Sequence, residues 1–191
     1  EGQKVEVTTG VHPAKDAVYA RIVSQLLKKQ RATIRLRFPY PTGKHADDAS
    51  DWTKPEKHQS EIIEQGAQKA LIKRTLDSTT YYVLLQWEGQ ATLSRCDSHE
   101  FELAANEDVL TVSAEYLNSL PTSQALAFEY DQYHKATLRH WNAWWKAGAI
   151  VDFSQCTDQR AKELERRVVL SQYLTQINCA NNMPPQETGL T

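Results

Sequence analysis

The sequence predicts a mainly β protein in which an antiparallel β-sandwich is followed by two long helices. Within residues 1–120, several short segments alternate apolar and polar side chains, which is the period of half-buried antiparallel strands. After Pro121 the apolar side chains recur at steps of three or four, the period of an amphipathic helix. Strands come first and helices second, so we expect a sandwich domain over residues 1–120 rather than a parallel α/β sheet.

The alternation is clearest in four segments, each with one apolar face that we expect to be buried. The expected core-facing residues are Val18, Ala20 and Ile22 in the first, Ile34, Leu36 and Phe38 in the second, Phe101 and Leu103 in the third, and Leu110, Val112 and Ala114 in the last.

Tyr81–Trp87 is apolar on both faces, which predicts a central strand, and Gly89 suits the turn that follows it. The segment 18–29 is less distinct, because its second half is rich in helix-forming residues. Its β-branched content and alternation favour a strand as far as Ser24, with a helix as the alternative.

The first helix is predicted to begin at a cap residue, Thr122 or Ser123, and to run to about Ala147, with Gly148 as the stop signal. It forms a helical linker over residues 121–156. Its apolar stripe comprises Ala127, Tyr130, His134, Leu138, Trp141 and Trp145.

The second helix is predicted to start near Thr157, with Asp158 placed favourably against the helix dipole. Glu163 and Arg167 are spaced for an ion pair on its exposed side. Its apolar face is wider than one stripe, and only 11 residues, from Asn181 to Thr191, follow it. We therefore expect residues beyond Thr191, or a partner, to cover it. The apolar residues are Ala161, Leu164, Val168, Val169, Leu170, Tyr173, Leu174 and Ile177.

The formal net charge of −2 offers no basic stripe for nucleic acid, and no apolar run is long enough to span a membrane. The chain starts at Glu1 without an initiator Met, so we expect a mature or excerpted segment. No P-loop, GxGxxG or Ser/His/Asp pattern occurs, and no cofactor is predicted.

The three cysteines, Cys96, Cys156 and Cys179, form no CxxC pair. Their odd number leaves at least one free thiol, and the disulfide status of the others stays open. We expect buried structural thiols, since free Cys behaves mainly as a small apolar residue.

A long loop is predicted from Pro39 to about Glu61. Trp52 lies in it among polar residues and either stacks on the apolar face of a sugar or pins the loop to the sandwich. Possible metal ligands also occur there, but their spacing matches no zinc or calcium pattern, so we predict no metal site. These residues are His45, Asp47, Asp48, Asp51 and His58.

Trp141, Trp144 and Trp145 follow helical spacing, which favours packing, although Trp144 lies off the stripe. We expect Glu163 and Glu165 to be solvated on a charged helix face. Glu187 differs, because it follows Pro184-Pro185-Gln186 at the expected helix end, and such loops often contact ligands.

Two stretches of the helical half, HWNAWWKAGAIVDFS and ELERRVVLSQYLTQINCANNMPPQETGLT, resemble the sandwich–barrel junction of six-hairpin glycoside hydrolases, in particular the family 65-like proteins. The upstream stretch VTTGVHPAKDAVYARIVSQLLKKQRATIRLRFPYP is similar to the amino-terminal sandwich of the same group. The resemblance covers nearly the whole chain, and PPQETGLT is its most specific part.

The resemblance implies an amino-terminal β-supersandwich, a helical linker, and an (α/α)6 barrel whose first helix and loop are residues 157–191. The general acid would lie beyond Thr191, so no catalytic residue is assigned here and the isolated chain is expected to be inactive. Gln186, Glu187 and Thr188 would contact an oligosaccharide at the barrel mouth, with Trp52 reaching it from the sandwich. The expected location is the periplasm or outside the cell.

The expected function is therefore the amino-terminal portion of a glycoside hydrolase, whose partner is the rest of its own barrel. The alternative is a non-catalytic module, a β-sandwich that binds carbohydrate or docks onto another subunit. The sugar, its linkage, and the choice between hydrolysis and phosphorolysis stay open.

Overall fold

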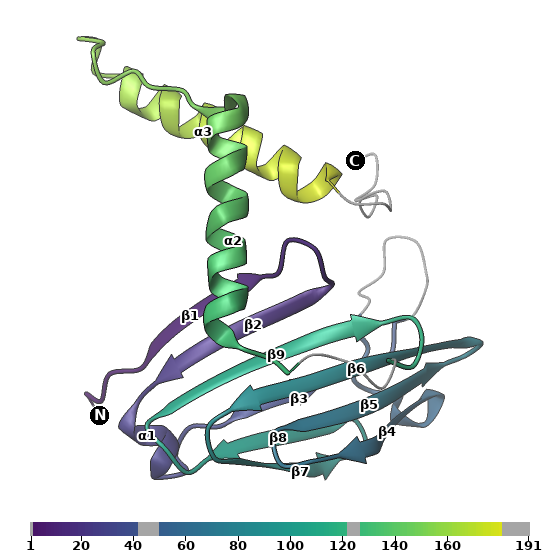
Figure 1. Ribbon diagram of the computed structural model, residues 1–191. Helices are drawn as coiled ribbons and strands as arrows, with labels where there is room; N and C mark the ends of the chain where they lie inside the picture. The colour runs from purple at the N-terminus through teal and green to yellow at the C-terminus, as the bar shows by residue number, and fades with distance from the viewer. Residues whose placement is uncertain (1, 42–49, 122–126, 181–191) are drawn as a thin grey trace. The chain divides into compact units, whose positions relative to one another are not determined.

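The computed structural model describes residues 2–41, 50–121 and 127–180. They belong to two compact units, Glu1–Thr137 and Leu138–Thr191, which we describe separately. The first unit contains two antiparallel sheets and the beginning of helix α2, and the second contains the rest of α2 and helix α3 (Figure 1). The prediction of a mainly β fold with antiparallel sheets followed by two helices is confirmed. The three-segment division at residues 120 and 156 stays a prediction.

The two sheets differ in width. The larger has six strands in the order β1-β2-β9-β6-β5-β4, and the smaller has three in the order β3-β8-β7. All paired strands are antiparallel, and the bounds in chain order are β1 Glu6–Val11, β2 Ala17–Val23, β3 Ile34–Arg37, β4 His58–Gln65, β5 Lys69–Leu76, β6 Thr79–Glu88, β7 Ala91–Asp97, β8 Glu100–Ala105 and β9 Val109–Leu117.

Strand β6 lies inside the larger sheet, between β9 and β5, as its two apolar faces predict. Val83 and Leu85 belong to the core between the sheets, and Leu84 on the opposite face is also buried. Gly89 ends the strand at φ +94°, a backbone conformation that glycine adopts at little cost.

One apolar core joins the sheets. It takes Ile72 from β5, Leu110 from β9, and Phe101 and Leu103 from the smaller sheet. All four side chains have less than 1% of their surface exposed. Phe38 is buried in the same core, with Ile34 and Leu36 packed against it, so the predicted apolar face of that segment is confirmed.

The two faces of strand β2 contact different elements. Ile22 reaches the core between the sheets, whereas Tyr19, on the other face, packs against Tyr130 and Tyr133 of α2. The expectation that Val18 is buried is wrong, since 48% of its surface is exposed. Val18 has the predicted orientation, but the smaller sheet is too narrow to cover it.

Ser24 resolves the ambiguity that follows β2. The strand ends at Val23, and Ser24 then caps a one-turn helix, α1 (Gln25–Lys28), by accepting a hydrogen bond from the Leu26 amide. Both sequence interpretations are therefore correct over part of the segment.

The predicted loop from Pro39 to about Glu61 is too long. The backbone of Tyr40 pairs with that of Asp51, a short 3-10 turn covers Pro55–Lys57, and β4 begins at His58. Sequence reasoning also missed β1, β5 and β7. Residues 42–49, which include His45, Asp47 and Asp48, lie outside the described residues.

Helix α2 (Tyr130–Trp144) begins later than predicted, because residues 127–129 are not helical. Thr122 and Ser123, the expected caps, lie outside the described residues. The helix ends in a single π turn, Trp145–Ala149, in which Gly148 has φ +135°, so its predicted role as the stop signal is confirmed.

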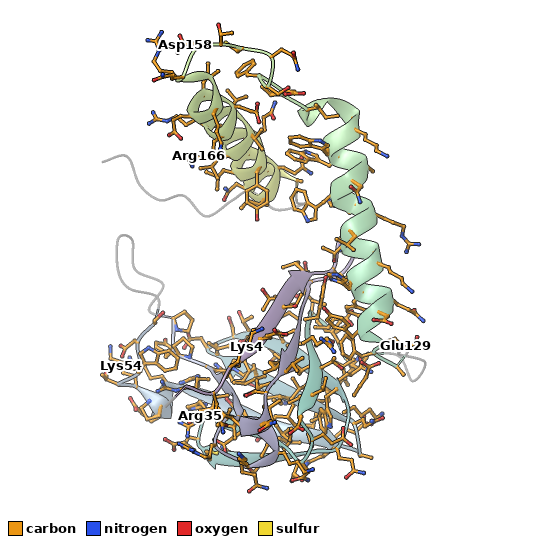
Figure 2. The ribbon with its side chains drawn as sticks, turned by 90° about the vertical axis from the view of Figure 1, so that its left-hand side faces the viewer. Lys4, Arg35, Lys54, Glu129, Asp158 and Arg166 are labelled. Carbon is orange, nitrogen blue, oxygen red and sulfur yellow. The ribbon has the colours of Figure 1, made fainter. Side chains whose placement is uncertain are left out.

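Helix α3 (Ala161–Cys179) starts four residues after the predicted cap, Thr157. Asp158 precedes the helix (Figure 2). Its carboxylate accepts bonds from the backbone and guanidinium of Arg160, and its carbonyl oxygen accepts one from the Ala161 amide. Asp158 therefore organises the entry to the helix.

The three cysteines are exposed and unbonded, so the expectation of buried thiols is wrong. Cys96 lies on β7 beside a register shift, Cys156 precedes α3, and Cys179 is the last residue of α3. None of these positions faces a core.

Tyr19 and Val18 offer a matched test of the two faces of β2. Tyr19→Ala should lower the free energy of unfolding by about 3–5 kcal/mol, because it empties an aromatic site packed against α2. Val18→Ala should cost less than about 1 kcal/mol, because half of that side chain is already exposed. Urea unfolding of both variants measures the difference, and equal losses would contradict the burial pattern.

Candidate functional site

A small pocket surrounds Trp52 at the end of the smaller sheet. Its walls come from β3, from the segment before β4, and from the turn between β7 and β8. The pocket has a volume of about 140 Å³ and is lined by Arg37, Phe38, Asp51, Trp52, Pro55, His58, Asp97, Ser98, His99 and Glu100.

Trp52 is both attached to the sandwich and accessible. The Arg37 guanidinium lies 4.5 Å from the centre of its ring, and Arg37 in turn pairs with Glu100 at 2.8 Å. Even so, 49% of the Trp52 surface is exposed. Its neighbour Asp51 accepts bonds from the Thr53 hydroxyl and amide, at 2.7 and 2.8 Å, which lower the pKa of that carboxyl to about 2.

Arg74 is a completely buried charge next to this pocket. It donates to five neutral acceptors: the Gln59 carbonyl at 3.0 Å, the Ser60 hydroxyl, the Tyr81 hydroxyl at 3.4 Å, His58 Nδ1 at 2.8 Å and His99 Nδ1 at 3.3 Å. Among the described residues, no carboxylate forms an ion pair with it. A guanidinium stays protonated in proteins, so the charge is held by neutral hydrogen bonds and by the Phe38 ring at 4.7 Å.

The two histidines beside Arg74 stack on each other, with ring centres 3.6 Å apart and planes 16° from parallel. Ser60 lies 2.7 Å from His99 Nδ1, and His99 Nε2 lies 2.8 Å from the Pro55 carbonyl oxygen. Burial, with smaller effects from His99 and Arg74, lowers the pKa of His58 to about 4. Because Arg74 can only donate, its hydrogen bonds in this cluster of Arg74, His58, His99 and Ser60 require an unprotonated Nδ1 on each ring.

Sequence reasoning treated His58 as a loop residue and missed Arg74. The available signal was positional, because Arg74 follows Ala70 and Ile72 and precedes Leu76 at alternate positions, and these three residues are buried. An arginine on the core-facing side of a strand needs several partners. The pattern does not reveal that two of them are histidines far apart in the sequence.

The second unit carries an aromatic groove. Trp141 contacts Tyr173 of α3 at 5.2 Å and Trp144 at 5.4 Å between ring centres, and Trp145 lies beside Trp144. All four rings line a cavity of about 490 Å³, and one of about 790 Å³ continues along α3 past Leu170. Trp144 therefore lines the same groove as the two tryptophans of the predicted stripe.

Much of the apolar surface of α3 is exposed. Glu163 pairs with Arg167, as predicted, and also with Arg166, both at 2.8 Å, which lowers the pKa of the Glu163 carboxyl to about 2. Glu165 was expected to be solvated but accepts a bond from the Phe153 amide at 2.7 Å. The exposed fractions are 53% for Leu164, 42% for Leu170, 40% for Tyr173, 44% for Leu174 and 49% for Ile177.

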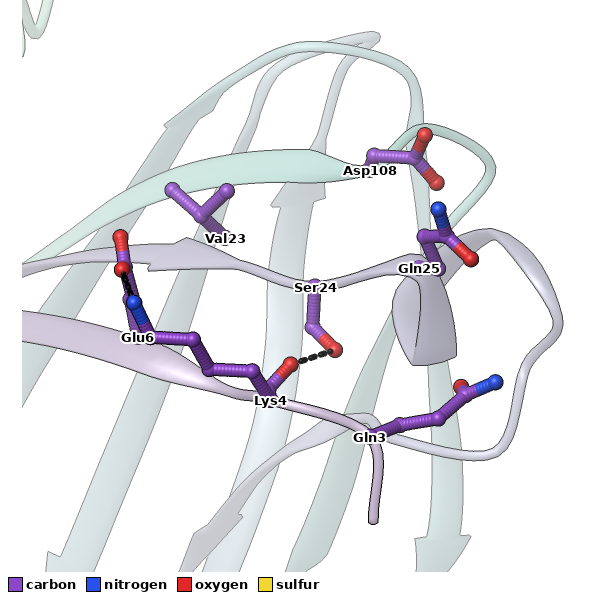
Figure 3. Close-up of a pocket in the computed structure, with 7 residues that line it drawn as sticks. All are labelled: Gln3, Lys4, Glu6, Val23, Ser24, Gln25 and Asp108. Carbon is purple, nitrogen blue, oxygen red and sulfur yellow. Dashed lines mark hydrogen bonds and ion pairs between the residues drawn. The ribbon is translucent and has the colours of Figure 1, made fainter.

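Another cavity, of about 440 Å³, lies beside the amino-terminal segment of the first unit. Figure 3 shows the Ser24 hydroxyl donating to the Lys4 carbonyl and the Lys4 ammonium paired with Glu6. Ser24 also caps α1, so its polar atom serves the backbone. The side chains of Ser24, Lys4 and Glu6 in this cavity therefore serve structural contacts.

Some predicted features lie outside the described residues or leave no structural trace. Gln186, Glu187 and Thr188 belong to the range 181–191, which is not described.

Within the described residues, no three potential ligands group as they would around a metal ion. A search of the same residues finds no helix with the length and apolar character needed to cross a membrane.

Replacing Arg74 by lysine tests the buried cluster. Lysine keeps the charge but cannot reach five acceptors at once, so Arg74→Lys should lower the free energy of unfolding by about 2–4 kcal/mol. Arg139→Lys, on the exposed side of α2, should change it by no more than about 0.5 kcal/mol. Chemical denaturation measures both, and a neutral Arg74→Lys would show that the hydrogen bonds contribute little.

No family model, curated protein or solved structure matches this chain. A function must therefore be argued from the residues, the two units and the resemblance given above.

Proposed function

We propose that this chain is the amino-terminal part of a glycoside hydrolase acting on oligosaccharides, in which the β-sandwich supports a catalytic helical barrel. The observation that carries the proposal is the exposed apolar surface of α3. Five large apolar side chains of this helix have 40–53% of their surface exposed. A helix with such a surface needs further packing partners, which a barrel of paired helices supplies.

The aromatic groove supports the same proposal. Trp141, Trp144 and Trp145 line a cavity with Tyr173 that extends along α3. Aromatic side chains contribute large buried areas, so a groove of this kind suits the packing of another helix. In the proposed enzyme, the neighbouring helix comes from the barrel beyond Thr191.

The sandwich is proposed to support the site rather than perform the chemistry. The Thr53 hydrogen bonds and Lys54 lower the pKa of Asp51 in the Trp52 pocket to about 2. A general acid needs a raised pKa, which is the opposite of the shift at Asp51. As the resemblance implies, the acid is proposed to lie in the barrel, where it would protonate the leaving oxygen while water or phosphate attacks the opposite face.

Substrate contacts are proposed at two places. Gln186, Glu187 and Thr188 would contact the oligosaccharide from the barrel mouth, as the resemblance implies. Trp52 would contribute from the sandwich, because it is half exposed and has polar neighbours able to bind hydroxyl groups. From the resemblance, we also propose that the enzyme acts in the periplasm or outside the cell.

A second candidate is a non-catalytic carbohydrate-binding module. It is favoured by one observation, namely that the Trp52 pocket is formed entirely within the first unit. Such a module would bind sugar without help from the helices. Sugar binding by residues 1–137 alone, with no turnover by the natural full-length polypeptide, would favour this candidate.

The first test is enzymatic. The natural full-length polypeptide should cleave a glycosidic bond in a panel of α- and β-linked oligosaccharides, with and without added phosphate, because the barrel supplies the acid. Residues 1–191 alone should show no turnover on the same panel. Product analysis by chromatography measures both, and activity in the short chain would place the catalytic groups within it.

The second test concerns the cover of α3. In the full-length protein, Leu170→Glu should lower the free energy of unfolding by at least about 2 kcal/mol, because the charge would enter a packed interface. Ser171→Glu, an exposed neighbouring position, serves as the control and should stay within about 0.5 kcal/mol. Equal, small effects on thermal unfolding would mean that the apolar face stays in solvent and that no barrel packs on it.

A further inference from the structure

We propose that Arg74, His58 and His99 form an acid-sensitive latch that holds residues 50–57, including Trp52, against the end of the sandwich. The latch is closed while the His58 imidazole is neutral and opens when His58 takes up a proton. This inference concerns the first unit alone and does not depend on the proposed enzymatic function.

The directions of the hydrogen bonds determine which ring nitrogens of His58 and His99 are unprotonated. Arg74 can only donate, so the His58 and His99 Nδ1 atoms that face it, at 2.8 and 3.3 Å, must both be unprotonated acceptors. His99 then carries its proton on Nε2 and donates it to the Pro55 carbonyl at 2.8 Å. A proton added at either Nδ1 removes a bond to Arg74.

The same proton also brings two positive charges together. The guanidinium is fully buried, and the two rings stack at 3.6 Å, so an imidazolium would lie next to a buried cation. In line with this arrangement, the pKa of His58 is lowered to about 4, first by burial and then by His99 and Arg74. The closed latch therefore excludes the charged form.

The surrounding charges do not reverse this preference. Glu56 is the one neighbouring group that raises the pKa of His58, and its effect is the smallest of the four. The other titratable or charged groups near the two rings are Arg37 on β3, Tyr40 and Lys57 beside His58, Asp51, Tyr81 on β6, and Asp97 and Glu100 at the turn between β7 and β8.

The latch acts on the segment that carries Trp52. His99 binds the segment directly through Pro55, and His58 follows it immediately in the chain. The other contacts holding the segment include the backbone pairing of Tyr40 with Asp51 and the stacking of Arg37 on Trp52. A proton on His58 repels its ring from Arg74, and because His58 stacks on His99 at 3.6 Å, this displacement also disturbs the His99 ring that binds Pro55. The remaining contacts lie near the surface, so the segment is then weakly attached.

The sign of the pH dependence follows from linkage. The pKa of His58 is lower in the closed state, about 4, than the ordinary value of 6.5, so the closed state is fully stabilised above pH 6.5. Its stability is lost as the pH falls from 6.5 towards 4. The equilibrium constant for opening should rise about ten-fold per pH unit in this window for each proton taken up.

Hydrogen exchange and NMR on residues 1–191 test the latch. The Asp51 and Lys57 amides, which bond to the Tyr40 and Lys54 carbonyls, report on the segment, and amides of the central strand β6 serve as internal controls. After correction for the intrinsic rate at each pH, protection of Asp51 and Lys57 should fall between pH 6.5 and 4 while that of β6 stays constant. Constant protection at all sites would overturn the proposal.

Variants separate the latch from general acid unfolding. The double variant His58→Gln and His99→Gln keeps side-chain acceptors for Arg74 but cannot titrate, so the loss of protection should disappear. His140→Gln, outside the first unit, should leave it unchanged. An identical transition in the double variant would overturn the latch. If the double variant does not fold, a nitrogen-15 NMR titration of the wild-type histidines replaces it. Protonated Nε2 at neutral pH, together with a His58 pKa well below 6.5, supports the latch. A His58 pKa near 6.5 overturns it.

Discussion

The structure depends most on the burial of a six-stranded sheet by a sheet of only three strands. Where the sheets overlap, the inner-facing residues of β5, β6 and β9 are buried in one core. At the edge formed by β1 and β2 there is no such cover, and Val7, Val11 and Val18 have 48–59% of their surface exposed. The outer face of the same edge is covered instead by Tyr130 and Tyr133 of α2.

At the opposite end of the core, the chain encloses a charge. Arg74 continues the inward-facing series of β5, and the space there contains the polar groups of His58, His99 and Ser60 beside the Phe38 ring. The hydrogen bonds stabilise the buried guanidinium and also connect the Trp52 segment to the sandwich through Pro55. The polar cluster and the candidate ligand pocket are thus physically continuous.

The second unit differs from the first in how much apolar surface it leaves exposed. Its aromatic residues contact one another, with Trp141 between Trp144 and Tyr173, but the leucine and isoleucine side chains of α3 have 42–53% of their surface exposed. Ion pairs such as Glu163 with Arg167 lie on the helix surface and contribute little to stability. Packing partners are therefore what this unit requires, and the proposed barrel would meet that requirement.

The sequence by itself determined the elements whose signal is local. Periodicity predicted the strand class, the central position of β6 and the change to helices, and Gly148 marked a helix end because glycine tolerates positive φ. The predicted start of α3 was misplaced, since Ser, Thr and Asp offer many equivalent starts. Only the tertiary structure decided which faces are covered, as the exposure of Val18 and of the three cysteines shows. The Arg74 cluster also needed it, because residues from β4, β5 and the β7–β8 turn meet there, and no local pattern encodes contacts between distant segments.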